Sequence, residues 1–194
     1  ISAPRMDIPK RTKLIVFYGT SILQGGCANR PGMAHTNIIS RRLNREIINL
    51  GFSGNALLDY EIAEVMSSVD AGVYVLDFVP NASAEQIYEK TETFYRILRD
   101  KHPRTPIIFI EDPVFTHTLF DKKIAGEVSK KNKAVNSVYK ALKTKGEKNI
   151  YMISSEKMLG EDGEATIDGI HFTDLGMMRY ADLVCPVIKK VLKK

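Results

Sequence analysis

The sequence predicts one α/β domain, a three-layer α/β/α sandwich around a five-stranded parallel sheet in the flavodoxin-like order. Short apolar runs alternate with longer amphipathic stretches five times along the chain, which is the pattern of parallel strands joined by crossover helices. The chain has 194 residues, of which 44% are hydrophobic and 26% charged. This suits a single core that helices cover on both faces of the sheet.

The first predicted strand occupies residues 13–18 and has five consecutive apolar residues, which indicates burial on both faces. It stops at Gly19, and the following turn brings Ser21 just past its carboxyl end. Open α/β sheets bind their ligands at that edge. Four further strands are expected at residues 45–50, 72–78, 106–111 and 149–153.

The intervening stretches have helical spacing of their apolar residues, or helix-start signals. Helices are expected at residues 36–43, 59–69, 84–101, 123–145 and 173–193, the last with Thr173 as its N-cap. In the stretch 123–145 the lysines are expected in water, and the core side is expected to hold Ile124, Val128, Val135, Val138 and Leu142. Residues 1–12 are predicted to be an extended lead-in, and residues 13–194 the domain itself.

Composition excludes several classes of function. No apolar run approaches the length needed to span a bilayer. The net charge of +5 comes largely from lysines, without the interleaved arginines and aromatics of a nucleic-acid surface. No phosphate loop or metal-ligand cluster is visible, so neither cofactor nor metal is expected. The two cysteines predict no disulfide framework; Cys27 is expected to be buried near Ser21, and Cys185 to lie in the core.

Short polar motifs stand at four strand ends of the predicted sheet. They are Gly19-Thr20-Ser21, Gly54, Asn81 and the segment Asp168-Gly169-Ile170-His171. All four loops open onto one edge of a parallel sheet, so these motifs can converge there.

Each of these residue types has a use in acyl transfer. The Ser21 hydroxyl needs a base to accept its proton, and the imidazole of His171 suits that role near neutral pH. A carboxylate holds the tautomer of such a base, and Asp168 is three residues away, so one turn can present both. The backbone N–H groups of Ser21 and Gly54 and the amide of Asn81 can stabilise a tetrahedral oxyanion.

These motifs together resemble those of the SGNH hydrolases, also called the GDSL esterase and lipase family, which are named after Ser, Gly, Asn and His. The likeness extends from Lys13 to the last predicted helix, with the blocks in the family's order. It implies Ser21 as nucleophile, His171 as base and Asp168 as the carboxylate that orients it. It also implies an oxyanion hole made by Ser21, Gly54 and Asn81.

Two blocks differ from the family pattern. Thr20 stands where the family usually has Asp, and Val79-Pro80-Asn81-Ala82 stands where it usually has Gly-x-Asn-Asp. The Pro-Asn form resembles a subgroup of carbohydrate-active SGNH esterases, in which a small β-sandwich domain often precedes this one. The resemblance therefore implies removal of short acyl groups, acetyl above all, from small-molecule or oligosaccharide esters, and a periplasmic or secreted location.

Other polar residues have open roles. Arg30, in the loop after Ser21, is a candidate substrate contact. Glu111 and Asp112, at the end of a strand, could line the site or cap the next loop, and Asp77 could accept a hydrogen bond beneath it. Two other functions also stay open: a non-catalytic ligand-binding module that retains the fold, and a basic docking surface for an acidic polymer along residues 122–148.

Overall fold

The computed structural model describes residues 12–193. Five parallel strands form one sheet in the order β2-β1-β3-β4-β5. This confirms the predicted flavodoxin-like order. The strands are β1 (Ile15–Gly19), β2 (Ile47–Gly51), β3 (Val73–Asp77), β4 (Ile107–Ile110) and β5 (Ile150–Ile153).

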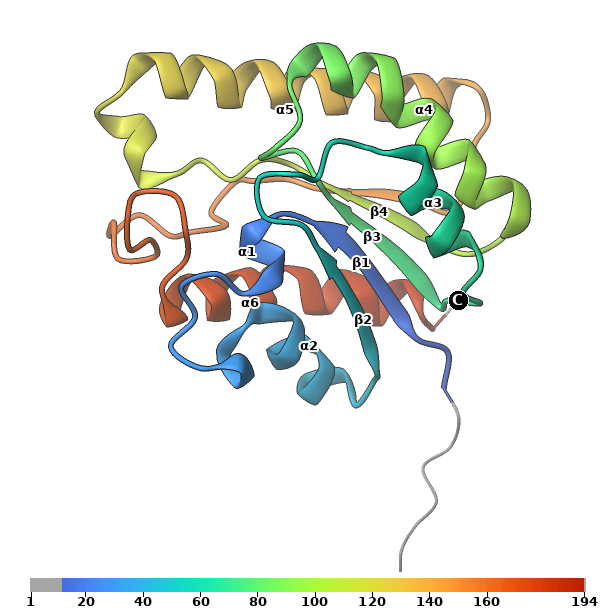
Figure 1. Ribbon diagram of the computed structural model, residues 1–194, viewed down its shortest axis with the longest axis horizontal. Coiled ribbons are helices and arrows are strands. Elements are labelled where there is room, and N and C mark those ends of the chain that lie inside the picture. Colours follow the sequence, from blue (N-terminus) through green and yellow to red (C-terminus); the bar gives the residue numbers. More distant parts are fainter. Residues whose placement is uncertain (1–11, 194) are drawn as a thin grey trace, which may run out of the picture.

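Helices cover both faces of the sheet, as predicted. In Figure 1, α2 and α6 lie below the sheet and α3, α4 and α5 lie above it. The helices are α1 (Ser21–Gln24), α2 (His35–Leu43), α3 (Tyr60–Ser67), α4 (Ala84–Lys101), α5 (Lys122–Thr144) and α6 (Asp174–Val191), with short 3-10 helices η1 (Pro31–Met33) and η2 (Thr116–Leu119). The sequence had not predicted α1, η1 or η2, because elements of three or four residues are too short to show a period.

Side chains of the central strands contribute to two separate hydrophobic cores, one on each face of the sheet. Along β1, Ile15 and Phe17 join the cluster that contains α2 and α6, whereas Val16 and Tyr18 join the cluster under α3 and α4. Since successive side chains of a strand point to opposite faces, an unbroken apolar run fills both layers. All five residues of β1 are buried, which confirms the interpretation of that run.

Side-chain caps begin the helices that matter for the site. Thr173 accepts a hydrogen bond from the Gly176 N–H and caps α6, as expected. Ser83 and Gln86 form a reciprocal capping box at the start of α4. These caps fix where the chain leaves the carboxyl edge of the sheet.

The two cysteines lie in different environments. Cys27 was expected to be buried, and this is wrong: the residue is exposed, because it ends the turn after α1 in a left-handed conformation (φ 68°). Cys185 is half-buried and packs against the α6 side of the core. The predicted lead-in at residues 1–12 falls almost wholly outside the described residues.

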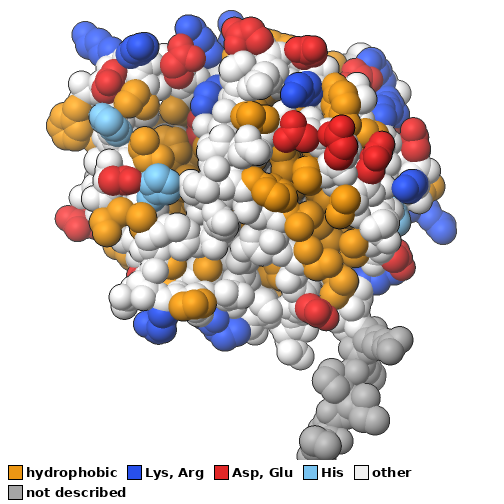
Figure 2. Space-filling view, viewed as in Figure 1, with side chains coloured by type: hydrophobic (Ala, Val, Ile, Leu, Met, Phe, Trp, Pro, Cys, Tyr) orange, Lys and Arg blue, Asp and Glu red, His pale blue; other side chains and the backbone are white. Residues whose placement is uncertain are grey.

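The lysine-rich helix α5 does not form an uninterrupted basic face. In Figure 2, acidic and basic side chains are interspersed along the upper edge, over α4 and α5. Lys130 pairs with Glu127, and Lys145 pairs with Glu92. Local pairing therefore reduces the positive potential that an acidic polymer would meet. Within residues 12–193, no helix is long and apolar enough to cross a membrane.

Candidate active site

The nucleophile candidate Ser21 is the first residue of α1, directly beyond the end of β1. The end of β1 approaches β3 closely, and only glycine fits at Gly19, because a Cβ there would lie 2.6 Å from the Asp77 carbonyl oxygen of the neighbouring strand. Thr20, the departure from the family's Asp, is buried and accepts a hydrogen bond from the Ile22 N–H. Thr20 therefore caps the short helix and supports Ser21 locally.

A continuous hydrogen-bonded chain joins three of the candidate residues. The Ser21 Oγ lies 2.9 Å from His171 Nε2, and His171 Nδ1 lies 2.6 Å from Asp168 Oδ2. The carboxylate fixes the tautomer: Nδ1–H donates to Asp168, so Nε2 has a free lone pair and accepts from the Ser21 hydroxyl. Residues 150 positions apart thus meet at the carboxyl edge of the sheet.

Local backbone geometry presents Asp168 to His171. The Oδ1 atom of Asp168 accepts the N–H groups of Ile170 at 2.9 Å and His171 at 2.7 Å, while Oδ2 faces the ring. Partial burial opposes ionisation, but the hydrogen bonds from the His171 ring and from these N–H groups outweigh it and lower the pKa of Asp168 to about 2. Asp168 therefore faces the imidazole as a carboxylate at neutral pH.

The turn between Asp168 and His171 is fastened at both ends. Ile167 N–H donates to the His171 carbonyl at 2.8 Å, and Thr173 N–H donates to the Ala165 carbonyl at 2.9 Å. Gly169 has a φ of +89° and a close approach to the His117 side chain, so a larger residue would be strained there. The turn that carries His171 is thus closed by its own backbone bonds and joined to the N-cap of α6.

The oxyanion candidates face the same cavity as the nucleophile. Ser21, Gly54, Asn81 and His171 all line a cavity of about 650 Å³. The Oδ1 of Asn81 accepts the Ala56 N–H at 3.3 Å, which leaves the amide –NH₂ of Asn81 free to donate elsewhere. Gly54 has a φ of +67°, a conformation that glycine adopts without strain.

The remaining walls come mostly from α5 and the loops around it, with Ile170 from the last motif. Apolar side chains of Phe115, Ile124, Val128 and Ile170 line the cavity. Charged side chains are mixed with them: Asp112, Asp121, Lys123, Glu127 and Lys131. The cavity is therefore neither a purely apolar tunnel nor a uniformly charged cleft.

The open candidates separate clearly. Arg30 precedes η1 and does not line the cavity. Glu111 holds the following loop, since its Oε2 accepts the Ser155 N–H at 2.7 Å and the Ser155 hydroxyl at 2.9 Å. Asp112 lies in the cavity wall. Of the two roles expected for this pair, Glu111 therefore holds the next loop and Asp112 lines the site.

Lys131 is the main wall residue that the sequence interpretation assigned wrongly. It was expected in water with the other lysines of α5, but its side chain is only 18% exposed and donates to the Pro80 carbonyl at 2.8 Å. A signal was present: Lys131 follows Val128 by three residues and precedes Val135 by four, so it belongs to the buried stripe.

A buried acid lies beneath the site. Asp77 Oδ2 accepts the Tyr180 hydroxyl at 2.6 Å, as expected for a hydrogen-bond acceptor there. Burial raises the pKa of Asp77 to about 7, with a smaller contribution from the Asp112 charge, although the Tyr180 hydrogen bond opposes both. The His35 ring packs against the Tyr180 ring in a tilted arrangement, with the centroids 4.3 Å apart, and burial lowers the pKa of His35 to about 3. Asp77 and His35 support the core; neither lines the cavity.

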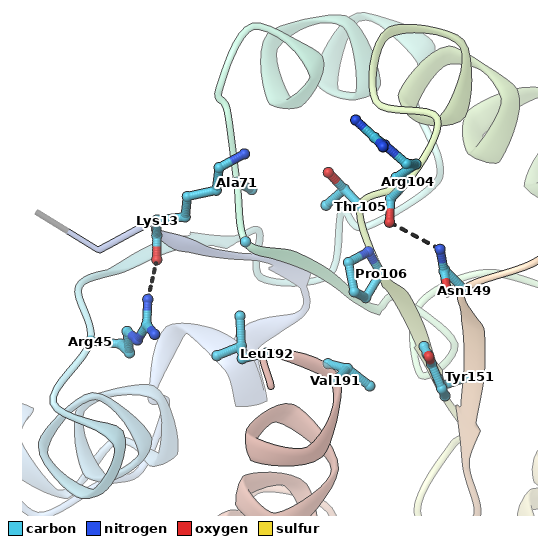
Figure 3. A pocket seen from close by; sticks show the side chains of 11 residues that line it. Lys13, Arg45, Ala71, Arg104, Thr105, Pro106, Asn149, Tyr151, Val191 and Leu192 are labelled. Carbon is cyan, nitrogen blue, oxygen red and sulfur yellow. Dashed lines mark hydrogen bonds between the residues drawn. The ribbon is translucent and has the colours of Figure 1, made fainter. Parts of the chain in front are cut away.

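A second cavity lies at the opposite, amino-terminal edge of the sheet (Figure 3). It has a volume of about 430 Å³ and is lined by Lys13, Arg45 and Arg104 among others. In that view, Arg45 donates to the Lys13 carbonyl and Asn149 donates to the Arg104 carbonyl. No candidate catalytic residue lines it, so all of these candidates lie at the carboxyl edge. Across the described part of the chain, no group of three or more His, Cys, Asp or Glu side chains is arranged to hold a metal ion.

Comparison with known families gives one clear match. The model of the GDSL-like Lipase/Acylhydrolase family matches residues 12–189 of the chain. A search of curated protein sequences finds no significant match.

Solved structures with the same fold extend this comparison. A GDSL-like lipase from Bacteroides ovatus is 41% identical, with a TM-score of 0.91, over 94% of this chain and 54% of that one. The salicylyl-acyltransferase SsfX3 from a tetracycline biosynthetic pathway is 18% identical, with a TM-score of 0.81, over 94% and 56%. A family two carbohydrate esterase from Clostridium thermocellum, in complex with cellohexaose, is 17% identical, with a TM-score of 0.71, over 97% and 67%. The chain spans about half the length of the first two proteins, and the last two likenesses concern the fold alone.

Proposed function

Because the chain belongs to the GDSL-like lipase and acylhydrolase family, we propose that it is a serine esterase that hydrolyses short acyl esters, acetyl esters of carbohydrates in particular. The observation that carries this proposal is the chain of contacts from Ser21 Oγ to His171 Nε2 and from His171 Nδ1 to Asp168 Oδ2. A fold retained only for binding would not require a nucleophile, a base and an orienting carboxylate at hydrogen-bonding distance.

In the proposed first step, the Ser21 Oγ attacks the ester carbonyl carbon while His171 Nε2 takes the hydroxyl proton. The carbonyl oxygen becomes an oxyanion, and the imidazolium that forms is stabilised by the Asp168 carboxylate. Collapse of the intermediate breaks the bond to the alcohol, which leaves with the proton from Nε2. The acyl group is then held as an ester on Ser21.

In the second step, water replaces the alcohol. His171 takes a proton from the water as it attacks the acyl carbonyl, and then returns that proton to Ser21 Oγ as the acid is released. The Ser21 N–H, the Gly54 N–H and the Asn81 amide stabilise the oxyanion in both steps. Each such donor is worth about 2.7–4 kcal/mol of activation free energy when it is removed.

The cavity lining supports a small acyl group and a polar alcohol. Side chains of Asp112, Lys123, Glu127 and Lys131 lie among its apolar walls. A long alkyl chain would take the exposed charges of Lys123 and Glu127 out of water without compensation. The fold neighbour that was solved with cellohexaose supports a carbohydrate as the alcohol component.

The test is hydrolysis of p-nitrophenyl acetate and of a panel of acetylated sugars by the parent and by Ser21→Ala and His171→Ala. Loss of either residue is expected to lower kcat by about 10⁴-fold or more. A fluorophosphonate probe separates this proposal from the ligand-binding module, since only an activated serine reacts with it. A parent protein that the probe does not label, or Ser21→Ala and His171→Ala variants as active as the parent, would contradict this mechanism.

A further inference from the structure

Lys131 occupies a position where a lysine is unusual. It lies in the middle of the buried stripe of α5, between Val128 and Val135, and its side chain is 18% exposed. Lysine is rarely buried without a partner, because removal of its ammonium from water is costly. A charge retained at this position therefore calls for a specific set of contacts.

Those contacts join three elements of the fold. The Lys131 ammonium donates to the Pro80 carbonyl at 2.8 Å, in the loop after β3. It also lies 3.8 Å from Oδ2 of Asp112, two residues beyond the end of β4. Lys131 thus bridges α5, the loop that carries Asn81 and the strand end that carries Asp112.

Asp112 provides the acidic partner: burial raises the pKa of its carboxyl to about 7, and the Lys131 charge opposes that rise and favours the ionised form. The Asp112 side chain is 1% exposed, and neither carboxylate oxygen has a hydrogen-bond partner within residues 12–193. Its backbone is fixed to α5 by two bonds with Asn132: Asp112 N–H donates to Asn132 Oδ1 at 2.7 Å, and Asn132 Nδ2 donates to the Asp112 carbonyl at 2.9 Å. The carboxylate is therefore held beside Lys131, which directly precedes Asn132 in the helix.

The bridge ends one residue before an oxyanion candidate. The Pro80 carbonyl belongs to the peptide that leads into Asn81, whose Oδ1 accepts the Ala56 N–H at 3.3 Å. The segment is thus held from one side by the backbone after β2 and from the other by Lys131. Displacements of about 1 Å in such a group can cost a hundredfold in rate.

We propose that Lys131, with Asp112 as its buried counter-charge, is a positioning residue that holds the Pro80–Asn81 peptide so that the Asn81 amide points at the developing oxyanion. This inference rests on the proposed esterase function. Lys131 acts through Asn81 and through no bond that changes in the reaction. Its effect therefore belongs to the transition state and not to the binding of the ester.

The test is a double-mutant cycle on p-nitrophenyl acetate. Lys131→Met keeps the apolar stem and removes the charge, and Lys131→Arg keeps a donor. Lys131→Met is expected to lower kcat about 10-fold to 100-fold with KM changed less than about twofold, and Lys131→Arg to recover much of that loss. In an Asn81→Ala background the same Lys131→Met substitution is expected to have almost no further effect, because the group that it positions is gone.

Two controls keep the outcomes separate. Lys130→Met removes the neighbouring lysine of the same helix, which is 68% exposed and pairs with Glu127, and it should leave kcat unchanged. Lys131→Met combined with Asp112→Asn removes both charges, so the loss of rate can be tested without an unpaired buried carboxylate. An equal loss in the parent and Asn81→Ala backgrounds, or a loss confined to KM, overturns the positioning role. An inactive parent, or an active Ser21→Ala, instead overturns the esterase proposal itself.

Discussion

Replacement of Asp168 by asparagine tests whether the hydrogen bonds of Asp168 set the tautomer of His171. In the parent, Oδ1 accepts two backbone N–H groups, from Ile170 and His171, and Oδ2 accepts His171 Nδ1–H at 2.6 Å. An asparagine amide has one oxygen and one –NH₂ group, so only one of these two sets can keep an acceptor.

The structure decides which set keeps it. An asparagine oxygen that faced the ring would turn –NH₂ toward the two backbone N–H groups and leave both without an acceptor, whereas the reverse orientation requires only that one ring proton move. The favoured orientation therefore keeps the asparagine oxygen on the two backbone N–H groups and turns –NH₂ toward His171 Nδ1. Nδ1 must then accept, the ring proton moves to Nε2, and Nε2 can no longer take the proton of Ser21.

We therefore expect Asp168→Asn to lower kcat for p-nitrophenyl acetate about 10⁴-fold, which corresponds to about 5.4 kcal/mol of activation free energy. Thermal unfolding followed by circular dichroism should show a folded variant. Asp182→Asn is the matched control, since that carboxylate pairs with Arg42 on the exposed side of α6, and it should retain parental activity. A kcat for Asp168→Asn within tenfold of the parent would refute the tautomer argument.

Three further predictions follow from individual contacts. Asn81→Ala should lower kcat about 10²-fold to 10³-fold with little change in KM, and an unchanged kcat in steady-state assays would remove this amide from the oxyanion hole. The raised pKa of Asp77, about 7, means that folding takes up a proton. Protonated Asp77 therefore stabilises the folded state fully below the unfolded pKa near 3.8, and this stabilisation is lost as the pH rises through 7. Asn cannot ionise, so the free energy of unfolding of Asp77→Asn should exceed that of the parent by up to about 4 kcal/mol at pH 8 and by far less at pH 4. Urea unfolding at both pH values checks this, and an equal difference at both would contradict it. Gly176→Ala should lower the free energy of unfolding by about 1–3 kcal/mol, because its Cβ would lie 2.1 Å from the Ala165 carbonyl oxygen; an unchanged melting temperature would show that the loop moves freely.

The layered fold was predictable because its signals are local. The apolar run before Gly19 indicates a buried strand wherever it lies in space, and the spacing of Val128, Val135 and Val138 indicates a helix face. The link between Asp168 and His171 is also local, since three residues of one turn present both side chains. Even Thr173 as a cap could be read from its position before the last helix.

The contacts that complete the site depend on tertiary structure. No pattern along the chain indicates that the Lys131 ammonium meets the Pro80 carbonyl, or that Asp112 and not Glu111 lines the cavity. The sequence shows the buried face of α5 on which Lys131 lies, but it predicts an exposed ammonium there. The partners of this ammonium come from the loops after β3 and β4, which are distant in sequence. Sequence periodicity thus determined which faces are buried, whereas the packing of helix against loop determined which polar groups stay there, because a buried charge is tolerated only where the fold supplies its partner.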